Sequence, residues 1–378
     1  MAGIYIHIPF CKKACHYCDF HFSTSPQYKK DMLSALRAEI LLQKSYLGNE
    51  LIETIYFGGG TPSLLAADEL QMLIGEISQN YDVSPVAEIT LEANPDDLNP
   101  QKVKELRGTA INRFSIGIQS FFEEDLKWMN RAHNSKEAES SVKRVQDAGF
   151  ENITIDLIYG YPLLTNEKWL ANIEQVIELE VPHISSYSIT VEPATALASF
   201  INKGKQQPMN ESKSAEQFLA LMSHLQDAGF EHYEISNFAK PGQYSRHNSN
   251  YWKGISYLGI GPSAHSFDGG TRQWNVANNA AYIESISRKI IPAEVEILTI
   301  PNRINEYIMT SIRTIWGMDI KRISKDFGPG YAEKITLQSQ QFLEKNWMVN
   351  NDQLITLTTK GKLFADHIAS ELFITGIE

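Results

Sequence analysis

The sequence predicts an α/β protein in which residues 1–240 form a full or partial (β/α) barrel, with a doubly wound parallel sheet as the second choice. Runs rich in β-branched and aromatic residues alternate with amphipathic helical stretches, which predicts parallel strands joined by right-handed crossovers. Cysteines, acids and a run of glycines come directly after these strands. Barrels and doubly wound sheets both bind their ligands at the carboxyl ends of the strands.

Seven strands are expected in chain order, at residues 4–8, 54–57, 88–91, 114–118, 153–158, 183–189 and 231–235. Ser25 and Asn99, each followed by proline, predict helix starts, because these residues cap helices and proline suits the first turn. Gly149 and Gly229 predict helix ends, because glycine accepts the left-handed conformation found there.

The alternation of strands and helices stops after the barrel. Residues 241–290 are expected to form a connecting segment, and residues 291–378 a smaller helical domain. A strand pair is expected at 348–350 and 354–357, followed by a helix from Thr359. Helices followed by a small hairpin resemble a winged-helix module.

The charge of the chain argues against one class of partner. Its 34 basic and 45 acidic residues give a net charge of −11, which disfavours binding to nucleic acid phosphates. The helical domain is therefore expected to pack or to act as a lid. The chain begins without a signal-peptide pattern and has no apolar run near the roughly 20 residues that span a bilayer. We expect a soluble, cytoplasmic protein.

All three cysteines, Cys11, Cys15 and Cys18, lie within eight residues in the spacing Cys-x3-Cys-x2-Cys. Structural zinc and all-cysteine iron–sulfur sites both take four protein ligands. Three thiolates favour a cubane cluster with one iron left open for a ligand that is not protein. Zinc remains an alternative, with a fourth ligand from one of three histidines: His7, His16 or His21. A disulfide would leave one thiol over and does not suit a reducing compartment.

Polar groups follow the next strands. Three glycines, residues 58–60, let backbone N–H groups approach an anionic or carboxylate atom, although an ordinary tight turn is the alternative. Glu92 ends the third strand, where it could accept from ribose hydroxyls or an ammonium group. Gln119, Arg131 and Asp156 form a polar set for a ligand with a carboxylate, which the arginine fork would bind.

The connecting segment is dense in stacking and hydrogen-bonding groups, at residues 246–252 and 259–266. Such a surface suits a flat aromatic ligand with carboxylates, such as a porphyrin. His247 and His265 are the candidate ligands for its metal, and buried structural histidines are the alternative.

These motifs resemble the radical S-adenosylmethionine superfamily: the cysteine motif after the first strand, Gly-Gly-Gly-Thr-Pro after the second, and glutamate at the end of the third. More narrowly, residues 5–11, 57–63 and 156–162 resemble the family of oxygen-independent coproporphyrinogen III oxidase and its HemW-type relatives. The resemblance covers nearly the whole chain, including a HemN-type C-terminal domain at 291–378.

The resemblance implies a partial (β/α)6 barrel of the TIM type holding a 4Fe–4S cluster on the three cysteines, with adenosylmethionine on the open iron. An electron donor such as flavodoxin or ferredoxin would reduce the cluster. By motif position, the residues that bind the cofactor are Tyr5, Tyr17, Gly59, Gly60, Thr61, Glu92, Gln119, Arg131 and Asp156.

Two departures separate this chain from the oxidase. Asp19 and Phe20 follow Cys18 where the oxidase has a fourth cysteine two residues on, and the long N-terminal arm of the oxidase is missing. Both departures, and the His-Asn-x-x-Tyr-Trp motif at 247–252, fit the HemW group, whose members resemble heme chaperones. The resemblance therefore implies a protein that binds heme and passes it to an acceptor protein. Oxidative decarboxylation of coproporphyrinogen III is the alternative, and a structural zinc protein is a weaker one.

Overall fold

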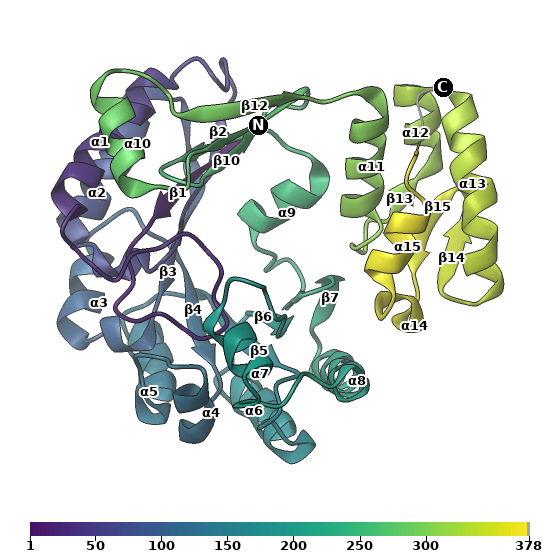
Figure 1. Ribbon diagram of the computed structural model, residues 1–378, viewed down its shortest axis with the longest axis horizontal. Helices are drawn as coiled ribbons and strands as arrows, with labels where there is room; N and C mark the ends of the chain where they lie inside the picture. Colours follow the sequence, from purple (N-terminus) through teal and green to yellow (C-terminus); the bar gives the residue numbers. More distant parts are fainter. Residues whose placement is uncertain (376–378) are drawn as a thin grey trace.

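The structure, a computed structural model, describes residues 1–375. Six parallel strands form the centre of its large sheet, and each pairs with the next along the chain (Figure 1). They are β1 (Ala2–Ile8), β2 (Ile52–Gly59), β3 (Val83–Ala93), β4 (Arg113–Gln119), β5 (Asn152–Tyr159) and β6 (His183–Ser188). The predicted α/β fold with a partial (β/α)6 barrel is confirmed.

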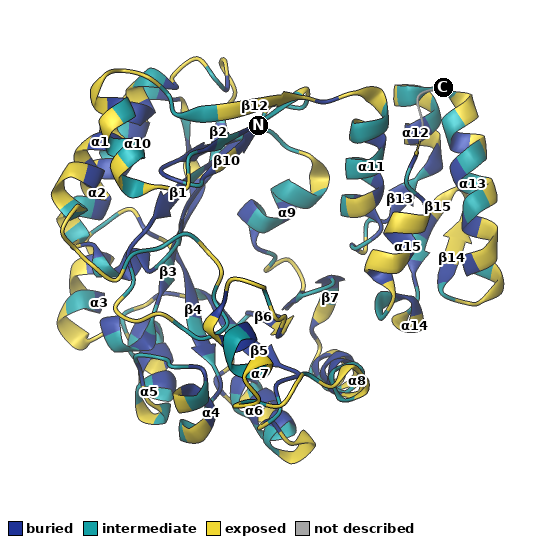
Figure 2. Ribbon diagram, viewed as in Figure 1, coloured by how far each residue is buried: buried dark blue, intermediate teal, exposed yellow. Residues whose placement is uncertain are grey.

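Helices cover the outer side of this sheet, and their inward faces are buried (Figure 2). They are α1 (Lys29–Leu42), α2 (Ala67–Asn80), α3 (Pro100–Arg107), α5 (Ser135–Asp147), α6 (Asn166–Glu178) and α8 (Glu211–Asp227). Two short helices, α4 (Glu123–Trp128) and α7 (Ala196–Asn202), lie instead beside the loop after β1, where His16 N donates to Met129 O and Leu197 N donates to His16 O. Two short 3-10 turns, η1 (Pro62–Leu64) and η2 (Pro95–Asp97), follow β2 and β3. Apolar residues between the strands and the helices form one continuous core.

The observed helix ends test the residues that were predicted to begin or end helices. Asn99 caps α3 by accepting from the backbone N–H of Lys102 at 3.0 Å, and Gly149 and Gly229 follow the ends of α5 and α8 with φ of 82° and 76°. These predictions are confirmed. The helix start predicted at Ser25 is wrong, because Ser25 belongs to a local turn and α1 begins at Lys29.

The strand predicted at 231–235 is present as β7 (Glu231–Glu234), but it is not a seventh parallel unit. The chain turns back at once into β8 (Asn237–Ala239), which pairs antiparallel with both β6 and β7. A parallel pairing needs a long crossover, and the two residues between β7 and β8 provide none.

The segment at 241–290 extends the other edge of the sheet. Its elements are α9 (Arg246–Lys253), β9 (Tyr257–Ile260), β10 (His265–Phe267), β11 (Thr271–Asn275) and α10 (Asn279–Ser287). Strand β9 pairs in parallel with β1, and β10, β11 and β12 (Ala293–Ile297) continue antiparallel. The large sheet thus continues past residue 290, and the division of the chain at residues 240 and 290 stays a prediction.

The remaining elements have their own core around Ile308, Ile335 and Phe342. They are α11 (Ile300–Ser311), β13 (Met318–Asp319), α12 (Ile320–Phe327), α13 (Pro329–Glu344), β14 (Met348–Asn351), β15 (Leu354–Leu357), α14 (Thr359–Lys362) and α15 (Ala365–Glu371). The predicted strand pair and the helix from Thr359 are confirmed. Across residues 1–375, none of the helices has the length and apolar character needed to cross a membrane.

A buried carboxylate fastens the connecting segment to the barrel. Glu39 of α1 is fully buried and accepts hydrogen bonds from Gly261 N at 2.7 Å, Asn275 Nδ2 at 2.7 Å and the Tyr282 hydroxyl at 2.5 Å. Burial raises the pKa of the Glu39 carboxyl to about 7. Three places in the segment therefore converge on one side chain of the first helix.

This carboxyl makes stability depend on pH. Because its pKa is about 7 in the folded state and 4.5 ordinarily, the folded protein keeps a proton that the unfolded chain has lost between these pH values. The contribution of Glu39 to the free energy of unfolding therefore falls by about 3 kcal/mol as the pH rises through this window. In urea denaturation, the free energy of unfolding should fall less steeply with rising pH in Glu39→Gln than in the wild type. Equal slopes would contradict the raised pKa.

Candidate active site at the carboxyl ends of the strands

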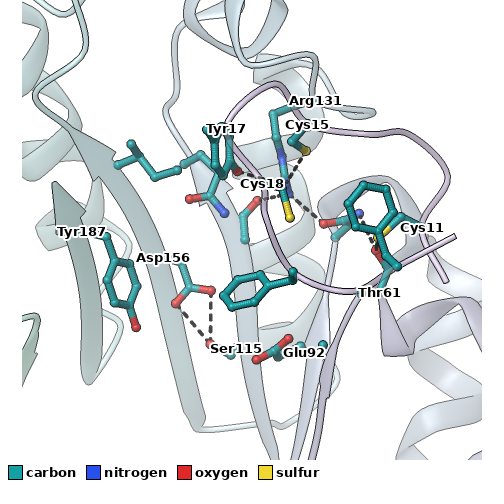
Figure 3. Close-up of a pocket in the computed structure, with 18 of the residues that line it drawn as sticks. Cys11, Cys15, Tyr17, Cys18, Thr61, Glu92, Ser115, Arg131, Asp156 and Tyr187 are labelled. Atoms are coloured by element: carbon teal, nitrogen blue, oxygen red, sulfur yellow. Dashed lines mark hydrogen bonds between the residues drawn. The ribbon is translucent and has the colours of Figure 1, made fainter. Parts of the chain in front are cut away.

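A cavity of about 560 Å³ lies at the carboxyl ends of the parallel strands (Figure 3). Most of the predicted site residues line it: Cys11, Cys15, Tyr17, Cys18, Gly59, Gly60, Thr61, Glu92, Gln119, Arg131 and Asp156. Tyr5, His247 and His265 do not. The structure therefore brings together the three cysteines and eight of the nine predicted cofactor positions, although these residues come from five strands and the loops after them.

The cysteine loop follows β1 and is held at several points by distant parts of the chain. Cys11 N donates to Ser23 O at 3.0 Å, and His16 N donates to Met129 O at 3.1 Å. Asn130 Nδ2 donates to Ala14 O at 2.7 Å. These bonds hold the cysteines at the rim of the cavity, half-buried, before any ligand binds.

Two of the thiols favour the neutral form. Burial raises the pKa of the Cys18 thiol to about 11, with further rises from the neighbouring Cys15 and Cys11. Burial also raises the pKa of the Cys11 thiol. A cation that replaced these two protons would remove this penalty, because the thiolate is the form that binds metal.

The histidines near the cysteines are engaged elsewhere. His7 Nε2 lies 2.8 Å from His21 O, His16 Nδ1 lies 2.8 Å from Trp128 O, and His21 Nε2 lies 2.8 Å from Asn279 Oδ1. Among residues 1–375, His, Cys, Asp and Glu side chains form no group of three or more that is arranged around a single metal ion.

Two side chains donate hydrogen bonds to cysteine sulfurs (Figure 3). The Thr61 hydroxyl donates to Cys11 Sγ at 3.4 Å, and Arg131 Nη1 donates to Cys15 Sγ at 3.5 Å and to the Tyr17 hydroxyl at 3.5 Å. Arg131 Nε is buried and has no hydrogen-bond partner within the described chain. The guanidinium therefore has one donor without a partner.

The glycine turn after β2 packs directly against the start of the cysteine loop. A Cβ atom on Gly60 would lie 2.6 Å from Phe10 O and 2.8 Å from Ile8 O, which no side chain could tolerate. Gly60 N donates to Ile8 O at 2.9 Å, and Thr61 N donates to Phe10 O at 2.7 Å. These two N–H groups thus join the two loops, and a free N–H cradle is not their role.

Two carboxyl groups face the cavity from β3 and β5, the strands on either side of β4 (Figure 3). Glu92 accepts from the Tyr56 hydroxyl at 2.8 Å, and Asp156 accepts from the Ser115 hydroxyl at 3.1 Å. Burial raises the pKa of each carboxyl to about 7. Each keeps oxygen lone pairs that can accept hydrogen bonds from ligand hydroxyl or ammonium groups.

His247 lies behind the cavity wall. Its ring is buried and stacks on Tyr56 at 4.9 Å between centroids. Nδ1 lies 2.8 Å from the Thr54 hydroxyl, and Nε2 lies 2.9 Å from the Tyr251 hydroxyl, so both ring nitrogens are paired. His265 is exposed on β10 beside Trp274.

Several lining residues carried no clear sequence signal. They are Phe20, Phe22, Tyr56, Asn94, Ser115, Ser185, Tyr187 and Asn248. The two-residue period of a strand could have found Ser115, which lies on the same face as Gly117 and Gln119. Phe20 and Phe22 lie in an irregular loop, where no period predicts the direction of a side chain.

The comparisons with known proteins agree with this geometry. Residues 5–176 match the radical SAM superfamily. The protein named heme chaperone HemW from Bacillus subtilis is 34% identical over 371 residues, covering 97% of this chain and 98% of its own. The protein of the same name from Lactococcus lactis is 32% identical over 373 residues, covering 99% of this chain and 97% of its own.

One solved structure shares the fold almost throughout. The coproporphyrinogen III oxidase HemN from Escherichia coli, described as a radical SAM enzyme, superposes with a TM-score of 0.84 over 98% of this chain and 90% of its own, at 23% identity. The full-length similarity to the HemW proteins is more specific. The chain therefore belongs to the radical SAM superfamily and, within it, to the HemW family.

Proposed function

We propose that this protein is a heme chaperone that carries a 4Fe–4S cluster with adenosylmethionine, binds heme and delivers it to an acceptor protein. The observation that carries the proposal is the similarity to relatives named heme chaperones, which covers 97% of this chain. The similarity includes the C-terminal domain as well as the barrel.

Cys11, Cys15 and Cys18 would hold the cluster. In a cubane each cysteine sulfur binds a different iron, so the sulfurs need not converge on one point. Around zinc they must converge, because each zinc–sulfur bond is about 2.3 Å long. Three protein ligands leave the fourth iron for the cofactor.

The cavity residues fit adenosylmethionine. The Arg131 guanidinium lines the cavity and suits the carboxylate of the methionine end, while Glu92 and Asp156 can accept from ribose hydroxyls. Gln119 and Tyr17 contribute further polar groups to the wall of the cavity. When bound, the reduced cluster and its cofactor supply one-electron cleavage of a carbon–sulfur bond, for which an electron donor such as flavodoxin or ferredoxin is needed.

Heme would bind at the mouth of the cavity. Phe20 and Tyr187 line it and are 69% and 45% exposed, so they offer flat apolar surface to a porphyrin face. With all three thiols on the cluster, the axial ligand would come from histidine or tyrosine. Neither histidine candidate lines the cavity itself, and His265 is favoured over His247 because it is exposed, whereas both ring nitrogens of His247 already have partners.

Coproporphyrinogen III oxidation is the second candidate, and the eight predicted cofactor positions that line the cavity favour it. The departure at Asp19 and Phe20 disfavours it. A heme chaperone and an oxidase would share the cluster, the cofactor and an affinity for porphyrins, and they would differ in turnover.

The first prediction concerns the metal. Anaerobically reconstituted wild type should contain about four irons with matching sulfide per chain, and Cys15→Ala should contain almost none, because three ligands are the minimum for an open-iron cluster. Iron and sulfide analysis measures this, and Ala14→Ser serves as a control in the same loop. One zinc per wild-type chain, or a normal cluster in Cys15→Ala, would contradict the assignment.

The second prediction concerns heme. His265→Ala should shift the heme absorption spectrum and weaken binding by roughly tenfold or more, about 1.4 kcal/mol, because an axial ligand is lost. His247→Ala should leave the spectrum unchanged. Titration of the purified proteins with heme measures both. An unaltered heme spectrum in His265→Ala would rule out His265 as the axial ligand. An altered spectrum in His247→Ala would mean that the His247 ring leaves Thr54 and Tyr251 to bind iron.

The third prediction separates the chaperone from the oxidase. Reconstituted protein given coproporphyrinogen III, adenosylmethionine and a reductant under anaerobic conditions should form no vinyl product. Chromatography of the porphyrins measures the product. Robust vinyl formation would replace the chaperone proposal with the oxidase.

A further inference from the structure

Asn94, the residue directly after β3, is fixed from both sides. Its backbone N–H donates to the Ser63 hydroxyl at 3.2 Å, and its carbonyl accepts from Asp97 N at 3.0 Å. Ser63 in turn donates to Asp97 Oδ2 at 2.7 Å. The side chain of Asn94 therefore projects toward the cavity from a rigid turn.

That side chain joins the two groups that donate to cysteine sulfurs. Asn94 Nδ2 donates to Thr61 Oγ1 at 3.3 Å, and Asn94 Oδ1 accepts from Arg131 Nη2 at 2.7 Å. Thr61 donates to Cys11 Sγ and Arg131 donates to Cys15 Sγ. One continuous chain of hydrogen bonds thus runs from the first cysteine to the second.

The direction of these bonds follows from chemistry. A guanidinium group can only donate, so the oxygen of the Asn94 amide must face Arg131 and its NH₂ must face Thr61. The Thr61 oxygen then accepts from the amide. Its single proton is left to point at Cys11 Sγ. The neutral amide therefore orients both donors toward sulfur.

We propose that Asn94 is a positioning residue that sets the reduction potential of the cluster by holding Thr61 and Arg131 as donors to Cys11 and Cys15. This inference rests on the proposed function, because it concerns the cluster. Hydrogen bonds to cysteine sulfurs stabilise the electron that enters on reduction, so they raise the potential.

A carboxylate at this position would act differently from the amide. Asn94→Asp still accepts from Arg131, but it cannot donate to Thr61. The Thr61 hydroxyl would then donate to the new carboxylate and turn away from Cys11. The new charge would also lower the potential by itself, so the contribution of Thr61 has to be measured separately.

The experiment measures how Thr61→Val changes the midpoint potential in the wild type and in Asn94→Asp. Because the new carboxylate is present both before and after Thr61→Val in the second background, its own effect on the potential cancels. In the wild type, Thr61→Val should lower the midpoint potential of the reconstituted cluster, and a tenfold change in the reduction equilibrium corresponds to about 59 mV for one electron. In Asn94→Asp, adding Thr61→Val should change it little. Thr61→Ser, which keeps the hydroxyl, should retain the wild-type potential. Redox titration followed by electron paramagnetic resonance measures each value.

Asn112→Asp is the matched control. Asn112 also makes two hydrogen bonds to β3, from Nδ2 to Ala87 O at 2.8 Å and from Ile89 N to Oδ1 at 2.8 Å, but it does not line the cavity. In this background Thr61→Val should keep its full effect. If Asn94→Asp does not retain iron, Asn94→Ala replaces it, and there the effect of Thr61→Val should be smaller than in the wild type.

Equal shifts from Thr61→Val in the wild type and in the Asn94 variant would overturn the inference and leave the proposed function standing. So would an unchanged potential in Thr61→Val itself. A wild-type protein that reconstitutes with zinc and no iron would overturn both proposals, and metal analysis distinguishes this outcome from the others.

Discussion

The close approach of two backbones, at the glycine turn after β2 and the start of the cysteine loop after β1, is the constraint on which the site depends. The parallel register of these strands, with Ile8 opposite Gly59, brings the two turns together. Gly60 permits the contact because a Cβ atom there would lie 2.6 Å from Phe10 O. The same contact places Thr61 beside Cys11, and from there the hydrogen bonds continue through Asn94 and Arg131 to Cys15.

The parts added to the barrel are bound to it by polar contacts as well as apolar packing. Glu39 holds the connecting segment from inside the core. The elements from α11 to α15 meet β7, where Ile315 N donates to Tyr233 O at 3.0 Å and Lys362 Nζ lies 2.8 Å from His232 Nδ1. Buried polar contacts are costly when broken, so these pairs specify how each part docks on the barrel.

The sequence predicted the fold where local signals and tertiary structure agree. Asn99 and Gly149 act through their own backbone neighbourhood, so their roles were visible in the chain. The antiparallel pairing of β7 with β8 was missed, because the sequence of a strand does not reveal the direction of its partner. Ser25 was misassigned because a serine before proline also suits a plain turn.

The cysteines and the polar residues at the strand ends could be predicted as site residues, because such residue types seldom occur together at these positions. The cavity contains them. The role of Asn94 could not be predicted, since it depends on Thr61 and Arg131, which are remote in sequence. The burial of His247 could not be predicted either, because Thr54 and Tyr251 enclose it only after folding.

The supports of the cysteine loop have a consequence for the order of biosynthesis. The three thiols leave the ribosome before the residues that fasten their loop, which are Thr61, Met129 through its carbonyl, and Leu197, whose N–H donates to His16 O at 2.8 Å. Translation must therefore pass Leu197 before the loop has all of its anchors. The loop thus reaches its folded geometry late, and the nascent thiols remain unprotected until then.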